Sequence, residues 1–507
     1  MQSPPEPTEP LRLDGAFARR TREDWRAAAE ASLPGGETLE GLAHRTLDGL
    51  SLDVLHDDSP LEGRWVPPPS SGAEGAAAAD RPQRELPSRL RVLGADATAA
   101  NAHARAGLEG GVGSLELSVG PAALPLEALD AALDGVHLDM VTVSLRAGEA
   151  MPAALEALLA LYRSRGHDPA NVRVELDADP LGALARDGRI ADGLGAAYER
   201  LASTSVRAVA ELPLARVAAI DTVVHHEAGA SVVQELIAGI ASATLALEHL
   251  LDAGLGPATA RERIAFRVSC DANLLDGVVK LRALERLWRH VLGECALPIA
   301  PPFVIVETSR RHLSRLAPWV NHLRNVVAGT AAAIGDADEL LVHPHDLVDG
   351  RRLGDDPAIA DRVARNLPLL LAEECGLRDV GDAAGGAHAI ESLTQRTAEA
   401  VWDGLGELQE RGGLGVALAS GKWQAALART HSARLRRLRE GDAVRVGVNR
   451  YRPADAPPSA EPPPAENPPT TAPTDVPDPR AVSRAAPLRA VREAEAFESE
   501  APAEAEA

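Results

Sequence analysis

Short runs of β-branched and other large apolar residues alternate with longer stretches that carry apolar residues at three- and four-residue spacing. The short runs predict strands, and the longer stretches predict amphipathic helices. The clearest helical stretches occupy residues 153–162, 231–251, 274–292 and 320–333. The predicted strands occupy residues 90–93, 115–119, 140–145, 172–176, 217–224, 264–268, 303–306 and 340–342.

This alternation limits the fold to the α/β class. Strands that alternate with helices pair in parallel, because crossover helices connect them and cover the sheet. Eight such units favour a closed (β/α)8 TIM barrel, with an open doubly wound sheet as the alternative. In barrels of this kind active sites gather at the C-terminal ends of the strands, so those positions are the first candidates for chemistry.

Proline and alanine density marks the domain boundaries. Residues 67–86 include PPPSSGAEGAAAA, which has no periodic apolar face and predicts a linker. Residues 1–66 form an extended N-terminal arm, and residues 87–451 form the barrel with additional C-terminal helices. Residues 452–507 are rich in Pro, Ala and Glu and poor in large apolar side chains, so we expect a disordered tail.

Composition excludes several partners. The formal net charge of −22 disfavours nucleic acid, because a negative surface repels phosphate backbones. The longest apolar runs fall short of the roughly 18 residues that cross a bilayer, and the first residues lack a secretory pattern. Cys270, Cys295 and Cys375 cannot form a disulfide framework, and no histidine pair has metal-ligand spacing. We therefore expect a cytoplasmic protein with no metal, membrane or nucleic-acid partner.

Several segments appear in a specific order along the chain. Residues 21–55 read TREDWRAAAEASLPGGETLEGLAHRTLDGLSLDVL. The body continues with ANAHARAGLEGGVGSLELSVG, VVHHEAGASVVQEL, KLRALERLW, WVNHLRNVVAGTAAAIG and ARNLPLLLAEECGLRDVGDAAGGAHAIESLT. This ordered set, covering residues 21–451, resembles the methylmalonyl-CoA mutase family and in particular its small subunit. The resemblance implies a barrel that, in catalytic members, threads coenzyme A along its axis and faces a cobalamin.

The resemblance also identifies two positions that decide catalysis. Catalytic members place a Tyr at the end of the first strand and a His at the end of the fifth, beside the migrating thioester. These positions align with Arg91 and Val224, so we expect no catalytic residue in this chain. The three tyrosines, Tyr162, Tyr198 and Tyr451, lie in predicted helices or at the start of the tail, and none can replace the missing phenol.

Three other residues near strand ends are candidates for substrate binding: His226, Glu227 and His343. His226 would share the face of Val224 only if the fifth strand remains extended there. Glu227 could be a buried acid, although a cap on the next helix is the simpler interpretation. His343 follows the eighth strand, at the barrel face where phosphate groups often bind.

No Asp-x-His-x-x-Gly segment, the family's cobalamin motif, occurs in the sequence, and the tail offers no length for a cobalamin-binding domain. We therefore expect no cofactor on this chain and adenosylcobalamin in a partner subunit. The resemblance implies the non-catalytic small subunit of a heterodimeric mutase that interconverts methylmalonyl-CoA and succinyl-CoA, with the arm embracing the catalytic large subunit. Two alternatives are a catalytic barrel served by a separate cobalamin-binding chain, and an interaction protein outside the mutase complex.

Overall fold

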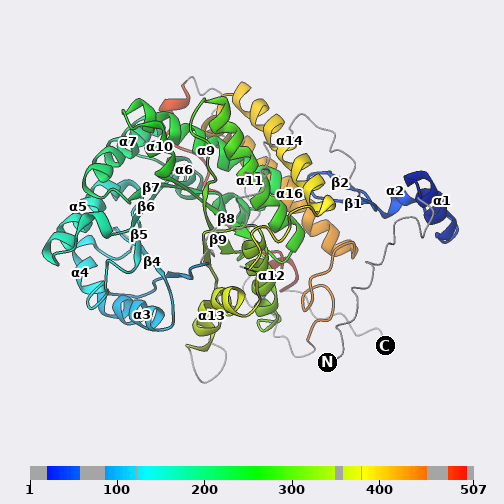
Figure 1. Cartoon of the computed structure of the whole chain (residues 1–507), viewed down its shortest axis with the longest axis horizontal. Helices are drawn as coiled ribbons and strands as arrows, with labels where there is room; N and C mark the ends of the chain where they lie inside the picture. The colour runs from blue at the N-terminus through cyan, green and yellow to red at the C-terminus, as the bar shows by residue number, and fades with distance from the viewer. Residues whose placement is uncertain are drawn as a thin grey trace, which may run out of the picture.

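A parallel sheet of eight strands forms the centre of the computed structural model, with strand order β10-β9-β8-β7-β6-β5-β4-β3 (Figure 1). Ser88 pairs in parallel with Leu340, and the Leu340 amide donates to the Pro87 carbonyl at 3.1 Å, so the first and last strands meet. The predicted (β/α)8 barrel is confirmed. The structure describes residues 20–56, 86–120, 123–348, 358–377, 379–453 and 478–498.

All eight predicted strands overlap an observed one. The fifth ends earlier than expected, at Asp221, because the Thr222 carbonyl accepts hydrogen bonds from the His225 and His226 amides and starts a helical turn. Val224 therefore lies in the short helix α8 (Val223–Glu227) and not in a strand. The strands are β3 (Arg89–Arg91), β4 (Ser114–Ser118), β5 (Thr142–Arg146), β6 (Val174–Ala178), β7 (Arg216–Asp221), β8 (Ile264–Cys270), β9 (Phe303–Thr308) and β10 (Glu339–Leu341).

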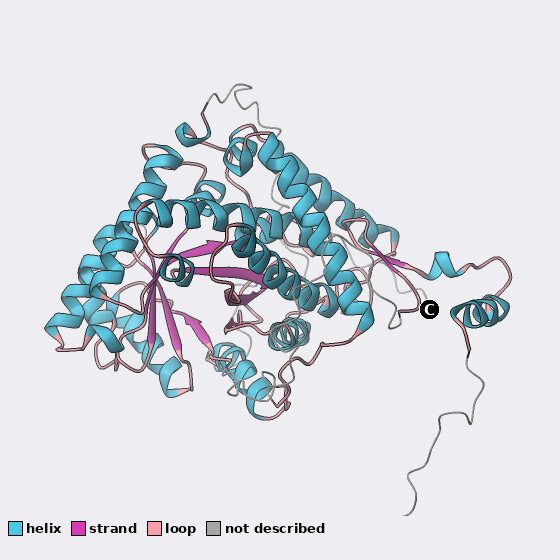
Figure 2. Cartoon of the chain, turned by 45° about the horizontal axis from the view of Figure 1, so that its top comes forward, coloured by secondary structure: helices cyan, strands magenta, loops and turns pink. Residues whose placement is uncertain are grey.

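Helices cover the outside of the barrel (Figure 2). The outward-facing apolar residues of the strands are buried in the core beneath them. Phe266 of β8, for example, packs edge-on against Trp288 at 5.2 Å between ring centroids. The helices around the barrel are α3 (Ala97–Glu109), α4 (Leu129–Ala132), α5 (Met151–Ser164), α6 (Pro180–Asp187), α7 (Gly193–Glu211), α9 (Val232–Asp252), α10 (Pro257–Glu262), α11 (Leu274–Glu294), α12 (Val320–Ile334) and α13 (Ile359–Glu373). A second layer adds α14 (His388–Glu410), α15 (Gly413–Ala419) and α16 (Lys422–Glu440).

The described part of the N-terminal arm extends away from the barrel (Figure 1). It contains α1 (Arg22–Ser32), α2 (Leu39–Leu42) and a hairpin of β1 (His44–Arg45) and β2 (Ser51–Leu52). Helix α1 begins with a capping box between Thr21 and Asp24 and buries none of its residues. The arm contacts the body through Asp48 to Ser231, and through Arg396 to the Ser51 carbonyl and to Asp53.

Residues 478–498, here called the strap, pack on the barrel, so the predicted disorder of residues 452–507 is wrong for this segment. Its main chain bonds to the end of α6 and to the loop that follows it: the Leu488 amide donates to the Ala185 carbonyl and the Ile190 amide donates to the Ser483 carbonyl. The strap includes η4 (Pro479–Ala481) and α17 (Glu495–Glu498) and buries the side chains of Val482, Leu488 and Phe497. Main-chain pairing compensates for its scarcity of large apolar residues.

Other boundary predictions fall largely outside the described residues, including almost all of the linker at 67–86 and the tail at 454–477 and 499–507. None of the described helices combines the length and the hydropathy that a bilayer-spanning segment needs.

Candidate functional site

Charged side chains from six strands meet inside the barrel. Arg267 lies at the centre, with its Nη2 2.6 Å from both Glu116 Oε2 and Asp177 Oδ2, and with Nη1 bonded to Glu307. All four side chains are nearly inaccessible to solvent. We call the following set the axial ion-pair network: Arg89, Arg91, Glu116, Glu175, Asp177, Arg267, Glu307 and Glu339.

Arg91, at the position of the family's tyrosine, belongs to this network. Its Nε lies 2.7 Å from Glu116 Oε1 and its Nη2 lies 2.8 Å from Glu307 Oε1. Burial alone would raise the pKa of Glu116, but Arg267 and Arg91 outweigh it and hold that pKa well below the usual range. Glu116 is therefore ionised at neutral pH, and the guanidinium of Arg91 is bonded to it and to Glu307.

The end of the fifth strand differs from the extended geometry we expected. Val224 is half-buried among apolar neighbours, and His226 points inward from α8. His226 Nδ1 lies 3.0 Å from Glu235 Oε2, and Nε2 lies 2.9 Å from Ser309 Oγ. Burial, assisted by Arg311 and Lys280, lowers the pKa of His226 to about 3, so the ring is neutral.

The Ser309, His226 and Glu235 atoms follow the order of a hydrolase triad, which the sequence did not reveal. Ser309, however, is completely buried, and its hydroxyl also accepts a hydrogen bond from the Arg311 amide. A substrate cannot reach this oxygen, so the three residues act as a structural link between α8, α9 and β9.

The imidazole of His225, next to His226 in α8, is also bonded within the protein. His225 Nδ1 accepts a hydrogen bond from Trp423 Nε1 at 3.1 Å, and burial lowers the pKa of His225 to about 4. Both histidines of α8 are therefore neutral, buried and bonded to other parts of the chain.

Glu227 is a buried acid and not a helix cap. Ser231 caps α9 in a capping box with Gln234, whereas Glu227 Oε1 accepts from the Arg310 amide at 2.9 Å. Burial raises the pKa of Glu227 to about 7, although Arg310 opposes the shift. The expectation of a cap is wrong because the chain turns through Gly229 before α9 begins.

His343 lies beside the network and not beside His226. Its Nε2 is 3.4 Å from Glu307 Oε2, and its carbonyl accepts from Asn325 Nδ2 at 2.7 Å. Burial lowers the pKa of His343, with Glu307 acting in the opposite direction. The three candidate binding residues thus do not converge on one pocket.

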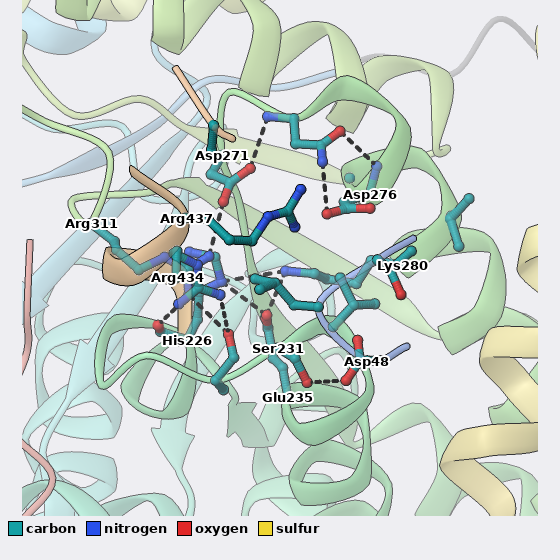
Figure 3. Close-up of a pocket in the computed structure, with 18 of the residues that line it drawn as sticks. Asp48, His226, Ser231, Glu235, Asp271, Asp276, Lys280, Arg311, Arg434 and Arg437 are labelled. Atoms are coloured by element: carbon teal, nitrogen blue, oxygen red, sulfur yellow. Dashed lines mark hydrogen bonds and ion pairs between the residues drawn. The ribbon is translucent and has the colours of Figure 1, made fainter. Parts of the chain in front are cut away.

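A cavity of about 210 Å³ lies beside the barrel and is lined by the arm hairpin, the N-terminal ends of α9 and α11, and α16 (Figure 3). We call it the side cavity. His226 reaches it, but Glu227 and His343 do not line it. Other residues in its wall are Asp48, Glu235, Asp271, Asp276, Lys280, Arg311, Arg434, Arg437, Arg445 and Glu493.

Lys280, one of two lysines in the chain, is a site residue that the sequence patterns did not predict. It is buried, bonded to Glu235, and donates to the Ser269 carbonyl at 2.6 Å. Its partner Glu235 has its pKa lowered to about 2, because Lys280 and His226 outweigh burial. The rarity of lysine in an arginine-rich chain was the available signal.

The strap contributes Glu493 to the same wall. Its carboxylate lies 3.4 Å from Arg434 Nε and 3.6 Å from Arg311 Nε, and it bonds to Arg445. These arginines outweigh burial and lower the pKa of Glu493 to about 2. Across the described ranges, no group of three or more His, Cys, Asp or Glu residues is arranged to hold a metal ion.

Together these features define a (β/α)8 barrel whose axis is closed by ion pairs and whose C-terminal segment crosses its strand ends. Residues 96–494 match the family described as Methylmalonyl-CoA mutase. The chain belongs to the methylmalonyl-CoA mutase family.

Three relatives illustrate this membership. The methylmalonyl-CoA mutase small subunit of Streptomyces virginiae is 35% identical, over 88% of this chain and 72% of that protein. The probable small subunit of Mycobacterium tuberculosis is 34% identical, over 80% of this chain and 66% of its own length. The small subunit of Propionibacterium freudenreichii subsp. shermanii is 29% identical, over 84% and 68% respectively. The chain thus spans about two thirds of the length of these relatives.

Proposed function

We propose that this chain is the non-catalytic small subunit of a heterodimeric, adenosylcobalamin-dependent methylmalonyl-CoA mutase, and that it stabilises the catalytic large subunit. The observation that carries the proposal is the axial ion-pair network. It fills the space through which, by family resemblance, a catalytic barrel threads coenzyme A.

A ligand on the barrel axis would have to separate Arg267 from its carboxylates. Breaking a buried ion pair costs about 3–5 kcal/mol, because the remaining partner stays charged and unsolvated. Arg267 has three such partners, Glu116, Asp177 and Glu307. Binding along the axis would therefore start from a large penalty that a coenzyme A chain cannot easily offset.

The tyrosines and the histidines of α8, which could supply the groups needed for catalysis, are also placed or bonded elsewhere in the chain. Tyr162 and Tyr198 are buried in α5 and α7, and Tyr451 follows α16 on the surface. His225 bonds to Trp423, and His226 bonds to Glu235 and Ser309. None of the described tyrosines lies at a strand end, and the two imidazoles of α8 are bonded within the protein rather than free to steer a radical there.

The described residues do not fit a cobalamin. The strap lies over α8, where the Val491 amide donates to the Glu227 carbonyl at 2.7 Å and the Glu493 amide donates to the Arg311 carbonyl at 3.1 Å. The imidazoles of α8 are buried, and both nitrogens of His226 and Nδ1 of His225 are bonded within the protein, so they do not present an accessible ligand for cobalt. We therefore assign adenosylcobalamin to the partner subunit.

The structure of the arm favours the presence of a second subunit. Helix α1 is amphipathic, buries no residue on its own body, and extends away from the barrel (Figure 2). An apolar face that finds no cover on its own chain is a typical contact for another chain. The relatives named small subunit are consistent with this, and we infer that the arm embraces a catalytic large subunit.

The decisive experiment combines activity and capture. The chain purified alone should show no isomerisation of methylmalonyl-CoA with adenosylcobalamin, whereas capture from native cells should recover a mutase large subunit at equal stoichiometry. Turnover by the isolated chain, alone or with a separate cobalamin-binding chain, would refute the non-catalytic role. Capture without any mutase subunit would instead favour an interaction protein outside the complex.

A further inference from the structure

The side cavity has the size and the walls of a small-molecule site. Its volume of about 210 Å³ is below the 300–1,000 Å³ range typical of drug-sized pockets, so it fits a ligand of few heavy atoms. Apolar side chains from three elements share its lining with the charged groups: Leu47 and Leu50 of the arm hairpin, Val279 of α11 and Leu393 of α14. A ligand with a short apolar body and charged ends would match such a wall.

Most charges around the cavity are neutralised within the protein. Glu235 pairs with Lys280, and Asp271 Oδ2 lies 2.9 Å from Arg311 Nη2. Glu493 takes Arg434 and Arg445 as partners. These pairs need nothing from a ligand.

Three charged side chains in the wall form no direct ion pair among the described residues: Asp48, Asp276 and Arg437. Lys280 and Arg434 act on the two carboxylates only at longer range. Asp48 accepts hydrogen bonds from the Ser231 hydroxyl and from the Val233 amide at 3.4 Å. Asp276 accepts only from Asn273 Nδ2, at 2.8 Å. The Arg437 side chain projects into the cavity, and no dashed contact reaches it in Figure 3.

We propose that the side cavity binds a small zwitterion of the amino-acid class. Its cationic nitrogen lies between Asp48 and Asp276, and its carboxylate pairs with the Arg437 guanidinium. The inference concerns this chain alone and does not depend on its role as a subunit.

The charge balance selects a zwitterion over simpler ions. A simple anion would neutralise Arg437 but meet two carboxylates, and a simple cation would leave Arg437 unpaired. The state of the carboxylates agrees with an unfilled cation position: burial raises the pKa of Asp276 to about 6, and Asp271 and Asp48 add to the shift. Burial also raises the pKa of Asp48.

The position of the cavity gives such a ligand a structural effect. Asp48 belongs to the arm hairpin, whereas Asp276 and Arg437 belong to α11 and α16 of the body. A bound zwitterion would therefore join the arm to the body, in addition to the contact of Asp48 with Ser231.

The test measures binding of the protein amino acids, one at a time, to the full chain by calorimetry and thermal shift. At least one should bind and raise the unfolding temperature. For that amino acid, the carboxamide and the deaminated acid should each bind roughly tenfold more weakly or worse, since a hydrogen bond to a charged group contributes about 1.5–3 kcal/mol.

Variants then assign the binding to two of the three charges, Asp276 and Arg437. Asp276→Asn and Arg437→Gln should each weaken binding by roughly tenfold or more, and Arg436→Gln, on an exposed neighbour, should leave it unchanged. The proposal is overturned if no amino acid binds, if either analogue binds as tightly as its parent, or if Arg437→Gln binds normally. Circular dichroism of each variant identifies any loss of folding.

Discussion

The barrel axis and the side cavity are both lined by arginines and carboxylates, yet the axis is closed and the cavity is open. On the axis, Arg267 is surrounded by carboxylates at hydrogen-bonding distance, and Arg91 completes the set. In the side cavity, Asp48, Asp276 and Arg437 face a common space without pairing with one another. Whether charged residues close a space or prepare it for a ligand thus depends on whether the chain supplies their partners.

The comparison also separates two kinds of cost. Buried pairs such as those on the axis contribute little net stability, but they are expensive to break. Half-exposed, unpaired groups contribute little in either direction. The following predictions run from the largest expected effect to the smallest.

Replacing Arg267 should disrupt the axial ion-pair network. Arg267→Met leaves Glu116, Asp177 and Glu307 buried with fewer cations, so the free energy of unfolding should fall by about 3–5 kcal/mol. Denaturant titration measures the change. Arg163→Met, which breaks a surface pair of a side chain that is 60% exposed, is the matched control, with an expected change below about 1 kcal/mol. A loss of similar size in both variants would contradict the importance of the network.

The strap should be the next most sensitive element. Glu493→Gln removes the carboxylate that Arg311, Arg434 and Arg445 share, and should lower the free energy of unfolding by about 2–3 kcal/mol. Limited proteolysis should then cleave within residues 478–498 first. Glu495→Gln, on the more exposed side of the strap, should keep the wild-type cleavage pattern. Equal resistance of both variants would show that the arginines do not depend on Glu493.

The neutral state of His226 predicts a pH dependence. Its pKa is about 3 in the folded chain and about 6.5 when unfolded, so the unfolded chain binds the extra proton between these values and stability falls as pH decreases. Between pH 7 and pH 5 the wild type should lose about 2 kcal/mol more than His226→Gln.

Urea unfolding of both proteins at the two pH values measures this difference. Glu227, whose folded pKa is about 7, titrates in the opposite direction in the same window, but it does so in both proteins and cancels. Parallel losses in the wild type and His226→Gln would mean that His226 is not held neutral.

The arm should give the smallest effect on this chain alone. Trp25→Ala changes α1, which has no buried residue, so the free energy of unfolding should change by less than about 0.5 kcal/mol. Capture of the large subunit should nevertheless decrease. Normal capture would remove Trp25 from the proposed contact with the partner.

Much of the barrel could be predicted from the sequence because the spacing of apolar residues differs between strands and helices and matches the faces that each element buries. The axial network was also visible in principle: LELSV, VRVEL, IAFRV and FVIVET each place a charged residue inside an apolar run. A charge at such a position must find a partner within the barrel. The family resemblance marks Arg91 only as a missing tyrosine, because its partners depend on strand register.

Other features could not be predicted locally. The segment VVHHEAG carries no pattern that distinguishes the end of a strand from a short helix, and Thr222 decides it through bonds to Arg267 and Glu235. The strap is held by main-chain bonds to loops around residues 185–194, which composition cannot reveal. The side cavity exists only because the arm hairpin returns to the barrel.

The place of Glu493 in the sequence has a consequence for synthesis. Arg311, Arg434 and Arg445 leave the ribosome before Glu493, the carboxylate that they share, although Asp271 already pairs with Arg311. Until then a growing chain with an otherwise complete barrel carries three crowded guanidinium groups at its rim. Synthesis of the strap, and not the assembly of the strands, would therefore complete this part of the rim.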